Sequence, residues 1–272
     1  MRRFFVKGRQ PVVGCILTVD DPAERHHMLD VLRMVPGDAA CFSDGAGTEY
    51  LARMLPPEDG TPVRQSVRFA VFETRRDGGD AQIRTTLYQG VPKQGKMEEI
   101  VQKTVELGVF RIRPVYMARS VPKEGGGADR KRERWQRIAA EACKQCRRAR
   151  VPEVASALPF AEALEEALAS DLLLFPYEQE KERTIRAVLA EVGRAGAGDS
   201  DALDAPAGFE PGSLAIGRSV ALFIGPEGGF SDREAAALMQ AGAQPCSLGR
   251  TILRTETAGA AALAMIRYEW EL

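Results

Sequence analysis

The sequence predicts an α/β protein in which a parallel sheet with helices on both faces follows a small N-terminal β-barrel. From about residue 81, short apolar strand segments alternate with amphipathic helical segments, which is the pattern of a covered parallel sheet. Residues 1 to about 75 hold several short β segments and one helix instead, which favours a barrel. The turn-rich stretch RRDGGD, residues 75–80, separates the two patterns, so we expect domains at 1–76 and 77–272.

The N-terminal domain is expected to consist of strands separated by Pro, Gly and Asp turns. The strand segments are 11–19, 39–44, 49–55 and 63–73. Between the first two, residues 22–38 have helical spacing and end at a Pro-Gly pair. His26 and His27 fall in this helix, and nothing in their surroundings gives them a catalytic role.

The C-terminal domain alternates strands with helices along its whole length. The strand segments are 81–89, 110–116, 171–176, 220–225 and 245–249. The helical segments are 95–109, 129–150, 179–193, 231–242 and 255–270. Gly108 is placed to end the first of these helices. Residues 193–217 are rich in Gly, Ala and Asp and are predicted to form a mobile surface insertion.

Composition limits the class of protein without identifying it. The 272 residues are 44% hydrophobic with a net charge of −1, but residues 130–150 hold nine Lys or Arg against two acids. A local basic face is therefore possible on a neutral protein. No apolar run fits a signal peptide or a membrane span, and five scattered cysteines suggest a reducing cytoplasm. Cys143 and Cys146 are one helical turn apart and lack the second ligand pair of a zinc site, so no metal is expected.

The stretch LFIGPEGGFSDRE, residues 222–234, combines a buried strand with a glycine-rich turn and a helix start. Pro226 stiffens the turn, while Gly228 and Gly229 permit positive φ and leave bare backbone. Ser231 and Glu234 have the spacing of a capping box. The pattern fits a ligand loop at the carboxyl end of a parallel strand, or a tight turn that needs glycine for its geometry alone. A Walker lysine is absent and Glu227 would repel phosphate, which favours a cationic or neutral ligand.

The stretch SLGRTILRTETAGAAALAM, residues 247–265, places Arg254 between a short strand and a helix rich in small residues. Such a helix packs closely against a neighbour, and a tightly packed core helix would explain it. An arginine in the turn between two buried elements usually has an anionic or carbonyl partner.

Together these two stretches resemble the RsmE family of the SPOUT superfamily, which are 16S ribosomal RNA (uracil-N3)-methyltransferases that use S-adenosylmethionine. Residues 1–6 and 26–38 resemble the family's PUA-like barrel. Residues 92–115 resemble its K-x-x-K-M-E segment, and residues 134–154 resemble its basic helix. Nearly the whole chain is covered. It departs from many relatives in lacking a proline after Gly249 and in carrying the acidic insertion near 193–217.

The resemblance implies a deep trefoil knot in the C-terminal domain, a homodimer formed through that domain, and a bent cofactor in the knotted loops. The residues expected to bind S-adenosylmethionine are Leu174, Phe175, Pro176, Ile224, Gly225, Pro226, Glu227, Gly228, Gly229, Leu248, Gly249, Ile252, Leu253 and Thr257. Backbone groups in these loops can read the adenine edge, and a nearby carboxylate is compatible with the sulfonium cation.

Methylation at uracil N3 requires the base to leave its stack and N3 to lose its proton. We assign Arg254 to stabilise negative charge on a uracil carbonyl oxygen or to orient the base, and Glu256 is a candidate proton acceptor. RNA contact also needs cations spread over a face. The candidates are Arg2, Arg3, Arg25, Arg33, Lys93, Lys96, Lys103, Arg134, Arg137, Arg147, Arg148 and Arg150.

Two other functions fit parts of the sequence. A nucleotide-binding hydrolase would use the GPEGG turn for another ligand, but neither a P-loop lysine nor a pair of metal-binding acids is evident. A ribosome-assembly factor would keep the fold and bind 16S rRNA without catalysis. A pure RNA-binding protein has no need for both GPEGG and ILRTET, so the methyltransferase is preferred.

Overall fold

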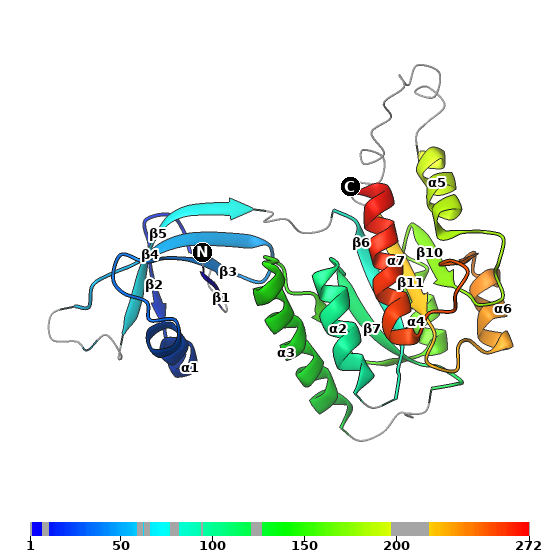
Figure 1. The fold of residues 1–272 in the computed structure, drawn as a ribbon, viewed down its shortest axis with the longest axis horizontal. Coiled ribbons are helices and arrows are strands. Elements are labelled where there is room, and N and C mark those ends of the chain that lie inside the picture. Colours follow the sequence, from blue (N-terminus) through cyan, green and yellow to red (C-terminus); the bar gives the residue numbers. More distant parts are fainter. Residues whose placement is uncertain are drawn as a thin grey trace, which may run out of the picture. The chain divides into compact units, whose positions relative to one another are not determined.

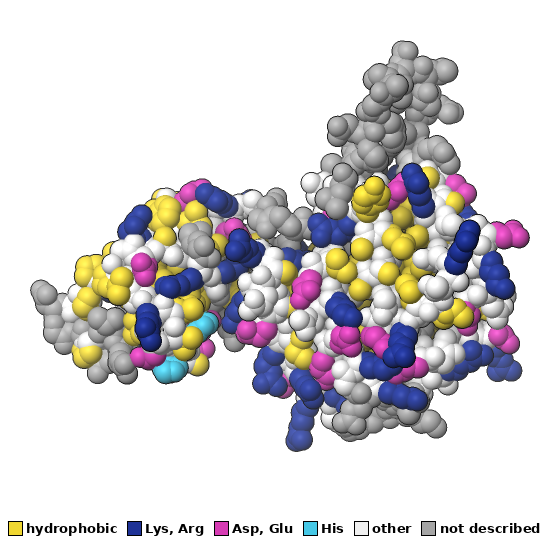
Figure 2. All heavy atoms as spheres, viewed as in Figure 1, with side chains coloured by type: hydrophobic (Ala, Val, Ile, Leu, Met, Phe, Trp, Pro, Cys, Tyr) yellow, Lys and Arg dark blue, Asp and Glu magenta, His cyan; other side chains and the backbone are white. Residues whose placement is uncertain are grey.

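The computed structural model describes residues 2–6, 11–58, 62, 66–76, 82–93, 95–120, 127–196 and 218–271. The chain forms two compact units (Figure 1), and Lys and Arg side chains are present on the surface of each (Figure 2). The first consists of Met1–Asp80 and Cys143–Val151, and the second of Ala81–Ala142 and Pro152–Leu272. Most of the predicted insertion, residues 197–217, lies outside the described residues.

The first unit is a five-stranded sheet with the strand order β1-β3-β4-β5-β2. Its strands are β1 (Arg2–Phe5), β2 (Ile16–Val19), β3 (Ala39–Ser43), β4 (Thr48–Met54) and β5 (Val67–Arg76). All neighbours run antiparallel except β1 and β3, which are parallel. Between β2 and β3, the chain forms α1 (Pro22–His26) and a π-helical turn, η1 (His27–Val31).

The sheet curls over a core in which Phe42 contacts both Phe4 and Phe69, and Met28 from η1 is fully buried. Strand β1 was not predicted as a strand, because RRFF has no alternation from which to recognise it. The four other strands overlap the predicted segments, although β4 begins one residue before its segment and β5 ends three residues beyond its own. Among the described residues no ladder joins β1 to β2, so the unit is a curled sheet over a helix.

The second unit is a parallel sheet, as predicted. Its strands are β6 (Arg84–Gly90), β7 (Arg111–Tyr116), β8 (Glu153–Val154), β9 (Leu158–Pro159), β10 (Leu172–Pro176), β11 (Ser219–Ile224) and β12 (Gln244–Cys246). They lie in the order β12-β10-β11-β6-β7-β8, with β9 also paired to β7, and every ladder is parallel. Strand order alone does not show whether the chain passes through a loop, so the trefoil knot stays a prediction.

Helices cover both faces of this sheet. The helices of the unit are α2 (Lys96–Glu106), α3 (Ala128–Cys146), α4 (Phe160–Ala167), α5 (Ile185–Gly196), α6 (Asp232–Gln240) and α7 (Thr255–Trp270). Helices α2 and α5 pack beside α7, and Gly259 of α7 lies against Leu87 and Ile224 of the sheet. The opposite face, including Phe223, packs against α4 and α6. Alternate residues of β11 therefore serve two cores, as expected for a strand buried on both faces.

Helix α3 ends earlier than predicted, at Cys146 instead of residue 150. Arg147 has a φ of +65°, which ends the helix. The residues that follow belong to the first unit: the Ser43 hydroxyl donates to the Ala149 carbonyl (2.5 Å), and the Val151 N–H donates to Gly45 (3.0 Å). The spacing of the basic residues at 147–150 predicted that the helix continues. Instead, the backbone of residues 149 and 151 forms hydrogen bonds with Ser43 and Gly45 of the N-terminal unit.

The described helices include none with both the length and the apolar character needed to cross a membrane.

The end of β6 is pressed against the turn that follows β11. A Cβ on Gly90 would lie 2.6 Å from the Cδ and N atoms of Pro226. Because backbone lies in the way, Gly90→Ala should destabilise the protein by about 3 kcal/mol or prevent folding, as expected for overpacking. Gly193→Ala is the matched control, since its Cβ would meet nothing closer than 3.8 Å and alanine favours the helix. Urea unfolding of both variants tests this, and equal stabilities would contradict it.

Candidate functional site

The glycine-rich loop leaves the carboxyl end of β11 and leads directly into α6. Ser231 and Glu234 form the predicted capping box, in which the Ser231 N–H donates to the Glu234 carboxylate (2.8 Å). The same carboxylate accepts the N–H of Ala118 (2.7 Å), which fixes the loop to the segment after β7. Within the turn, the Gly229 N–H donates to the Pro226 carbonyl (2.9 Å). The loop is therefore held in shape by the protein itself.

The chain's own packing favours the glycines of this loop, as the tight-turn interpretation predicts. A Cβ on Gly225 would lie 3.0 Å from the backbone of Gly229, and one on Gly228 would lie 3.0 Å from the Cβ of Arg119. Gly229 has a φ of +68°, which favours glycine. The tight-turn explanation therefore holds for the geometry, and it does not conflict with ligand binding.

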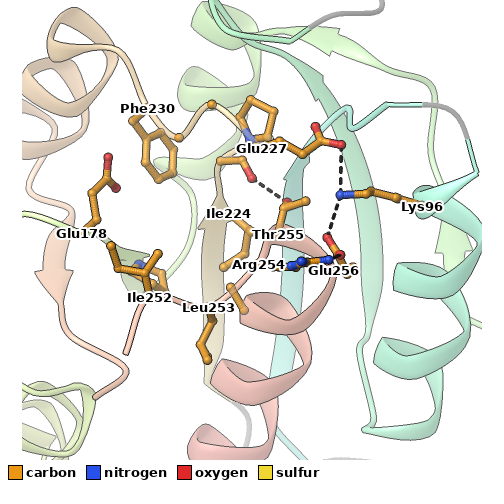
Figure 3. A pocket seen from close by; sticks show the side chains of 16 residues that line it. Lys96, Glu178, Ile224, Glu227, Phe230, Ile252, Leu253, Arg254, Thr255 and Glu256 are labelled. Carbon is orange, nitrogen blue, oxygen red and sulfur yellow. Dashed lines mark hydrogen bonds and ion pairs between the residues drawn. The ribbon is translucent and has the colours of Figure 1, made fainter. Parts of the chain in front are cut away.

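The loop forms one wall of a cavity of about 480 Å³, within the range typical of small-molecule sites (Figure 3). The lining residues are Lys96, Pro176, Glu178, Ile224, Gly225, Pro226, Glu227, Gly228, Gly229, Phe230, Ile252, Leu253, Arg254, Thr255, Glu256 and Ala258. They come from the ends of β10 and β11, the segment before α7, and the starts of α2 and α7. This is the carboxyl edge of the parallel sheet, where open α/β sheets bind ligands.

Thr255 joins the pieces of the site. Its hydroxyl donates to the Gly225 carbonyl (2.7 Å) and accepts a hydrogen bond from the side-chain amide of Gln89 (2.9 Å). Both Thr255 and Gln89 are buried. Neither was predicted as a site residue, whereas the predicted Thr257 is exposed and lies outside the cavity lining. Thr255 and Thr257 are both threonines in the first turn of α7, so the sequence does not indicate which of them faces the site.

A lysine bridges two carboxylates on one side of the cavity. The Lys96 ammonium lies 3.2 Å from Glu256 and 3.4 Å from Glu227, and Glu227 also accepts the N–H of Lys93 (3.0 Å). Lys96 was predicted as an RNA contact, and its pairing with these carboxylates was not predicted from the sequence.

These contacts shift the pKa of all three groups. The hydrogen bond from its own backbone N–H, reinforced by Lys96, lowers the pKa of Glu256. Burial raises the pKa of Glu227, but hydrogen bonds from backbone N–H groups and from Lys96 outweigh it and leave that pKa lowered. The Glu256 carboxylate in turn raises the pKa of Lys96. All three groups are therefore held in their charged forms.

Arg254 stands at the mouth of the cavity. It precedes the first residue of α7, its side chain is 83% exposed, and its guanidinium lies 3.9 Å from Glu256. An exposed guanidinium beside a cavity is free to contact a substrate that approaches from solvent.

The structure places nine of the predicted cofactor residues around the cavity. They are Pro176, Ile224, Gly225, Pro226, Glu227, Gly228, Gly229, Ile252 and Leu253. The other five lie outside its lining. Leu174 and Phe175 are fully buried in the core, and Leu248, Gly249 and Thr257 are close in sequence to the lining residues 252–256 without being among the lining residues themselves. Cofactor contact by these five stays a prediction.

The predicted RNA-binding cations divide by exposure. The exposed ones are Arg2, Arg33, Lys93, Arg134, Arg137 and Arg147, while Arg25, Lys103 and Arg150 are half-buried. Besides the half-buried Lys96, which pairs with Glu227 and Glu256, two others of the set are not open surface cations. Arg3 pairs with Glu49 at 2.6 Å and donates to the carbonyl of Arg147, and Arg148 is only 6% exposed. Sequence gives the charge of such residues but not the partners folded against them.

Glu178, Phe230 and Arg119 also belong to the site and were not predicted. Glu178 and Phe230 line the cavity, and Arg119 packs on the loop and donates to the Gly228 carbonyl (2.9 Å). Phe230 directly follows the GPEGG turn, and this position in the sequence could have identified it as a site residue. Among the described residues no group of three or more His, Cys, Asp or Glu is placed to hold a metal.

Comparison with known families agrees with this geometry. Residues 80–267 match the RNA methyltransferase domain family, and residues 19–60 match the RNA methyltransferase PUA domain family. The fold and the site thus define an RNA methyltransferase with an N-terminal PUA domain.

The relatives are more specific. Ribosomal RNA small subunit methyltransferase E of Bacillus subtilis is 32% identical over 100% of this chain and 98% of its own. The enzyme of that name from Mycobacterium bovis is 30% identical over 94% of this chain and 87% of its own. The chain therefore belongs to the ribosomal RNA small subunit methyltransferase E family. A crystal structure of the Neisseria gonorrhoeae member, bound to S-adenosyl methionine, has a TM-score of 0.77 and 27% identity, covering 99% and 98% of the two chains.

The Lys96 cluster predicts a pH-dependent contribution to stability. The lowered pKa values of Glu227 and Glu256 stabilise the fold above the unfolded value of about 4.3, and this is lost as pH falls through the folded pKa. The raised pKa of Lys96 contributes below about 10.4 and is lost as pH rises through its folded value. Lys96→Met should therefore reduce stability most between these limits, as measured by urea unfolding across pH.

Lys103→Met is the matched control, because Lys103 forms an exposed pair with Glu99 at 2.6 Å on the same helix. We expect it to change the urea midpoint less than Lys96→Met at pH 7, and the two variants to converge near pH 3. A Lys96→Met penalty that does not depend on pH would contradict the assignment.

Proposed function

We propose that this protein transfers a methyl group from S-adenosylmethionine to N3 of a uridine in the RNA of the small ribosomal subunit. The observation that carries the proposal is the exposed Arg254 beside a cavity lined by bare loop backbone at the carboxyl edge of the sheet. Membership of the methyltransferase E family supports the same reaction class and substrate.

The cavity fits the cofactor in size and chemistry. Its GPEGG wall offers backbone N–H and C=O groups that can hydrogen-bond an adenine edge, and Ile224, Ile252 and Leu253 offer apolar contact. The loop geometry is set by the chain's own packing, so the site is formed before a ligand enters. We assign Pro176, Ile224, Gly225–Gly229, Ile252 and Leu253 as its cofactor contacts. When bound, S-adenosylmethionine supplies a methyl group already activated by the sulfonium.

Arg254 is assigned to the target base. Its guanidinium can donate to a uracil carbonyl oxygen, where negative charge develops as N3 loses its proton. Positioning contributes as well, because the base must be held with N3 facing the cavity. Removing one such donor from an acyl-transfer enzyme costs about 10²–10³ in rate, which sets the scale expected here.

Glu256 is assigned to position its neighbours, in place of the proton-acceptor role considered from the sequence. Its carboxylate is shared by Lys96 (3.2 Å) and Arg254 (3.9 Å), and its pKa is lowered, chiefly by its own backbone N–H. A carboxylate with a lowered pKa is a weak base. Its position instead limits where Arg254 can point.

The exposed cations supply candidate phosphate contacts on each unit. Arg2, Arg33 and Arg147 belong to the first unit, and Lys93, Arg134 and Arg137 to the second. Structured RNA is recognised through its shape and splayed-out bases, which suits a docking domain joined to a catalytic one. We propose in addition a trefoil knot, a homodimer through the second unit and a cytoplasmic location, on the basis of the family resemblance.

Loss of the gene tests the function directly. Small-subunit rRNA from a deletion strain should lack a 3-methyluridine that mass spectrometry detects in the parent, and the purified protein with S-adenosylmethionine should restore it. An unchanged modification in the deletion strain would favour the assembly-factor alternative.

Arg254→Ala should lower methyl transfer by about 10²–10³, while calorimetry gives an affinity for S-adenosylmethionine near that of the wild type. Arg250→Ala is the matched control, because Arg250 is an exposed arginine four residues earlier that lies outside the cavity lining. It should leave the rate within about twofold. If Arg254→Ala transferred methyl groups at the wild-type rate, its assignment would be wrong.

A further inference from the structure

The three carboxylates that line the cavity are not equivalent. Glu227 and Glu256 share the ammonium of Lys96, at 3.4 Å and 3.2 Å, and Arg254 adds a second cation 3.9 Å from Glu256 (Figure 3). The negative charge on that side is therefore compensated by the protein itself. A ligand cation gains little from carboxylates that already have such partners.

Glu178 lies on the opposite side of the cavity, just after β10 (Figure 3). Its Oε1 atom is 2.9 Å from the point that a Cβ on Gly229 would occupy, so the carboxylate sits directly over the bare backbone of the GPEGG loop. Among the described residues it forms no hydrogen bond or ion pair. Arg119, which packs against Gly228, donates to the Gly228 carbonyl.

The charges of the cavity lining leave one negative charge uncompensated. Lys96 and Arg254 contribute two positive charges, and Glu178, Glu227 and Glu256 contribute three negative ones, for a sum of −1. S-adenosylmethionine carries +1 at neutral pH, because its ammonium and carboxylate cancel and the sulfonium remains. The sulfonium is also the charge that disappears when the methyl group leaves and S-adenosylhomocysteine forms.

We propose that Glu178 is the counter-anion for the sulfonium and sets the preference of this site for S-adenosylmethionine over S-adenosylhomocysteine. The inference rests on the proposed function, since it concerns the same cavity. The carboxylate attracts the charged methyl donor and has no such attraction for the neutral thioether, so it favours exchange of product for fresh donor. Because Glu178 is exposed, the effect is modest and weakens with salt.

Isothermal calorimetry with the purified full-length protein tests this. Glu178→Gln keeps the shape of the side chain and removes its charge. We expect it to weaken binding of S-adenosylmethionine by about three- to fivefold at low salt and to leave S-adenosylhomocysteine within about 1.5-fold. The difference between the two ligands should shrink at 0.5 M salt.

Glu182→Gln is the matched control, since Glu182 is an exposed glutamate four residues further on and outside the cavity lining. It should change neither affinity, which excludes an effect of net charge alone. Equal weakening of both ligands by Glu178→Gln, or weakening of neither, would overturn the proposal. Failure of the wild-type protein to bind S-adenosylmethionine would instead count against the proposed function.

Discussion

The site depends on one buried hydroxyl. Thr255 donates to the Gly225 carbonyl at the end of β11 and accepts from Gln89 at the end of β6, so three segments far apart in sequence meet at one atom. The residues on either side of it, Arg254 and Glu256, take their positions from this anchor. Because Thr255 and Gln89 are buried and Gly225 is half-buried, removing the hydroxyl would leave polar groups unpaired, which costs more than the bond itself contributes.

Charge is arranged around that anchor in two layers. Next to it, Lys96 holds Glu227 and Glu256 in their ionised forms and ties the start of α2 to the loop and to α7. Further out, Arg254 is exposed and has only a long contact to Glu256. The inner group can therefore stay rigid while the outer guanidinium adapts to a base, which suits a substrate whose target must first be unstacked.

The sequence predicted the parallel sheet and all but one of its helices because each element there carries a clear period or a strong cap, as Ser231 and Glu234 do. It missed β1, β8 and β9, since strands of two to four residues hold few positions to show alternation, and it missed α4, a helix of eight residues with no side-chain cap at its start. The GPEGG loop and Arg254 could be found from residue type and spacing. The roles of Lys96, Thr255 and Arg3 could not, because each depends on a partner that only folding brings near.

The glycines of the GPEGG loop show why such a site is difficult to interpret from sequence. A Cβ on Gly225 or Gly228 would crowd Gly229 or Arg119 at 3.0 Å, and a Cβ on Gly90 would clash with Pro226 at 2.6 Å. Packing of this kind fixes the loop before any ligand arrives, so little ordering cost is left for the binding step. Tight packing and ligand binding both favour glycine at the same positions of this loop. The amino-acid composition of the loop therefore cannot show which of the two accounts for its glycines.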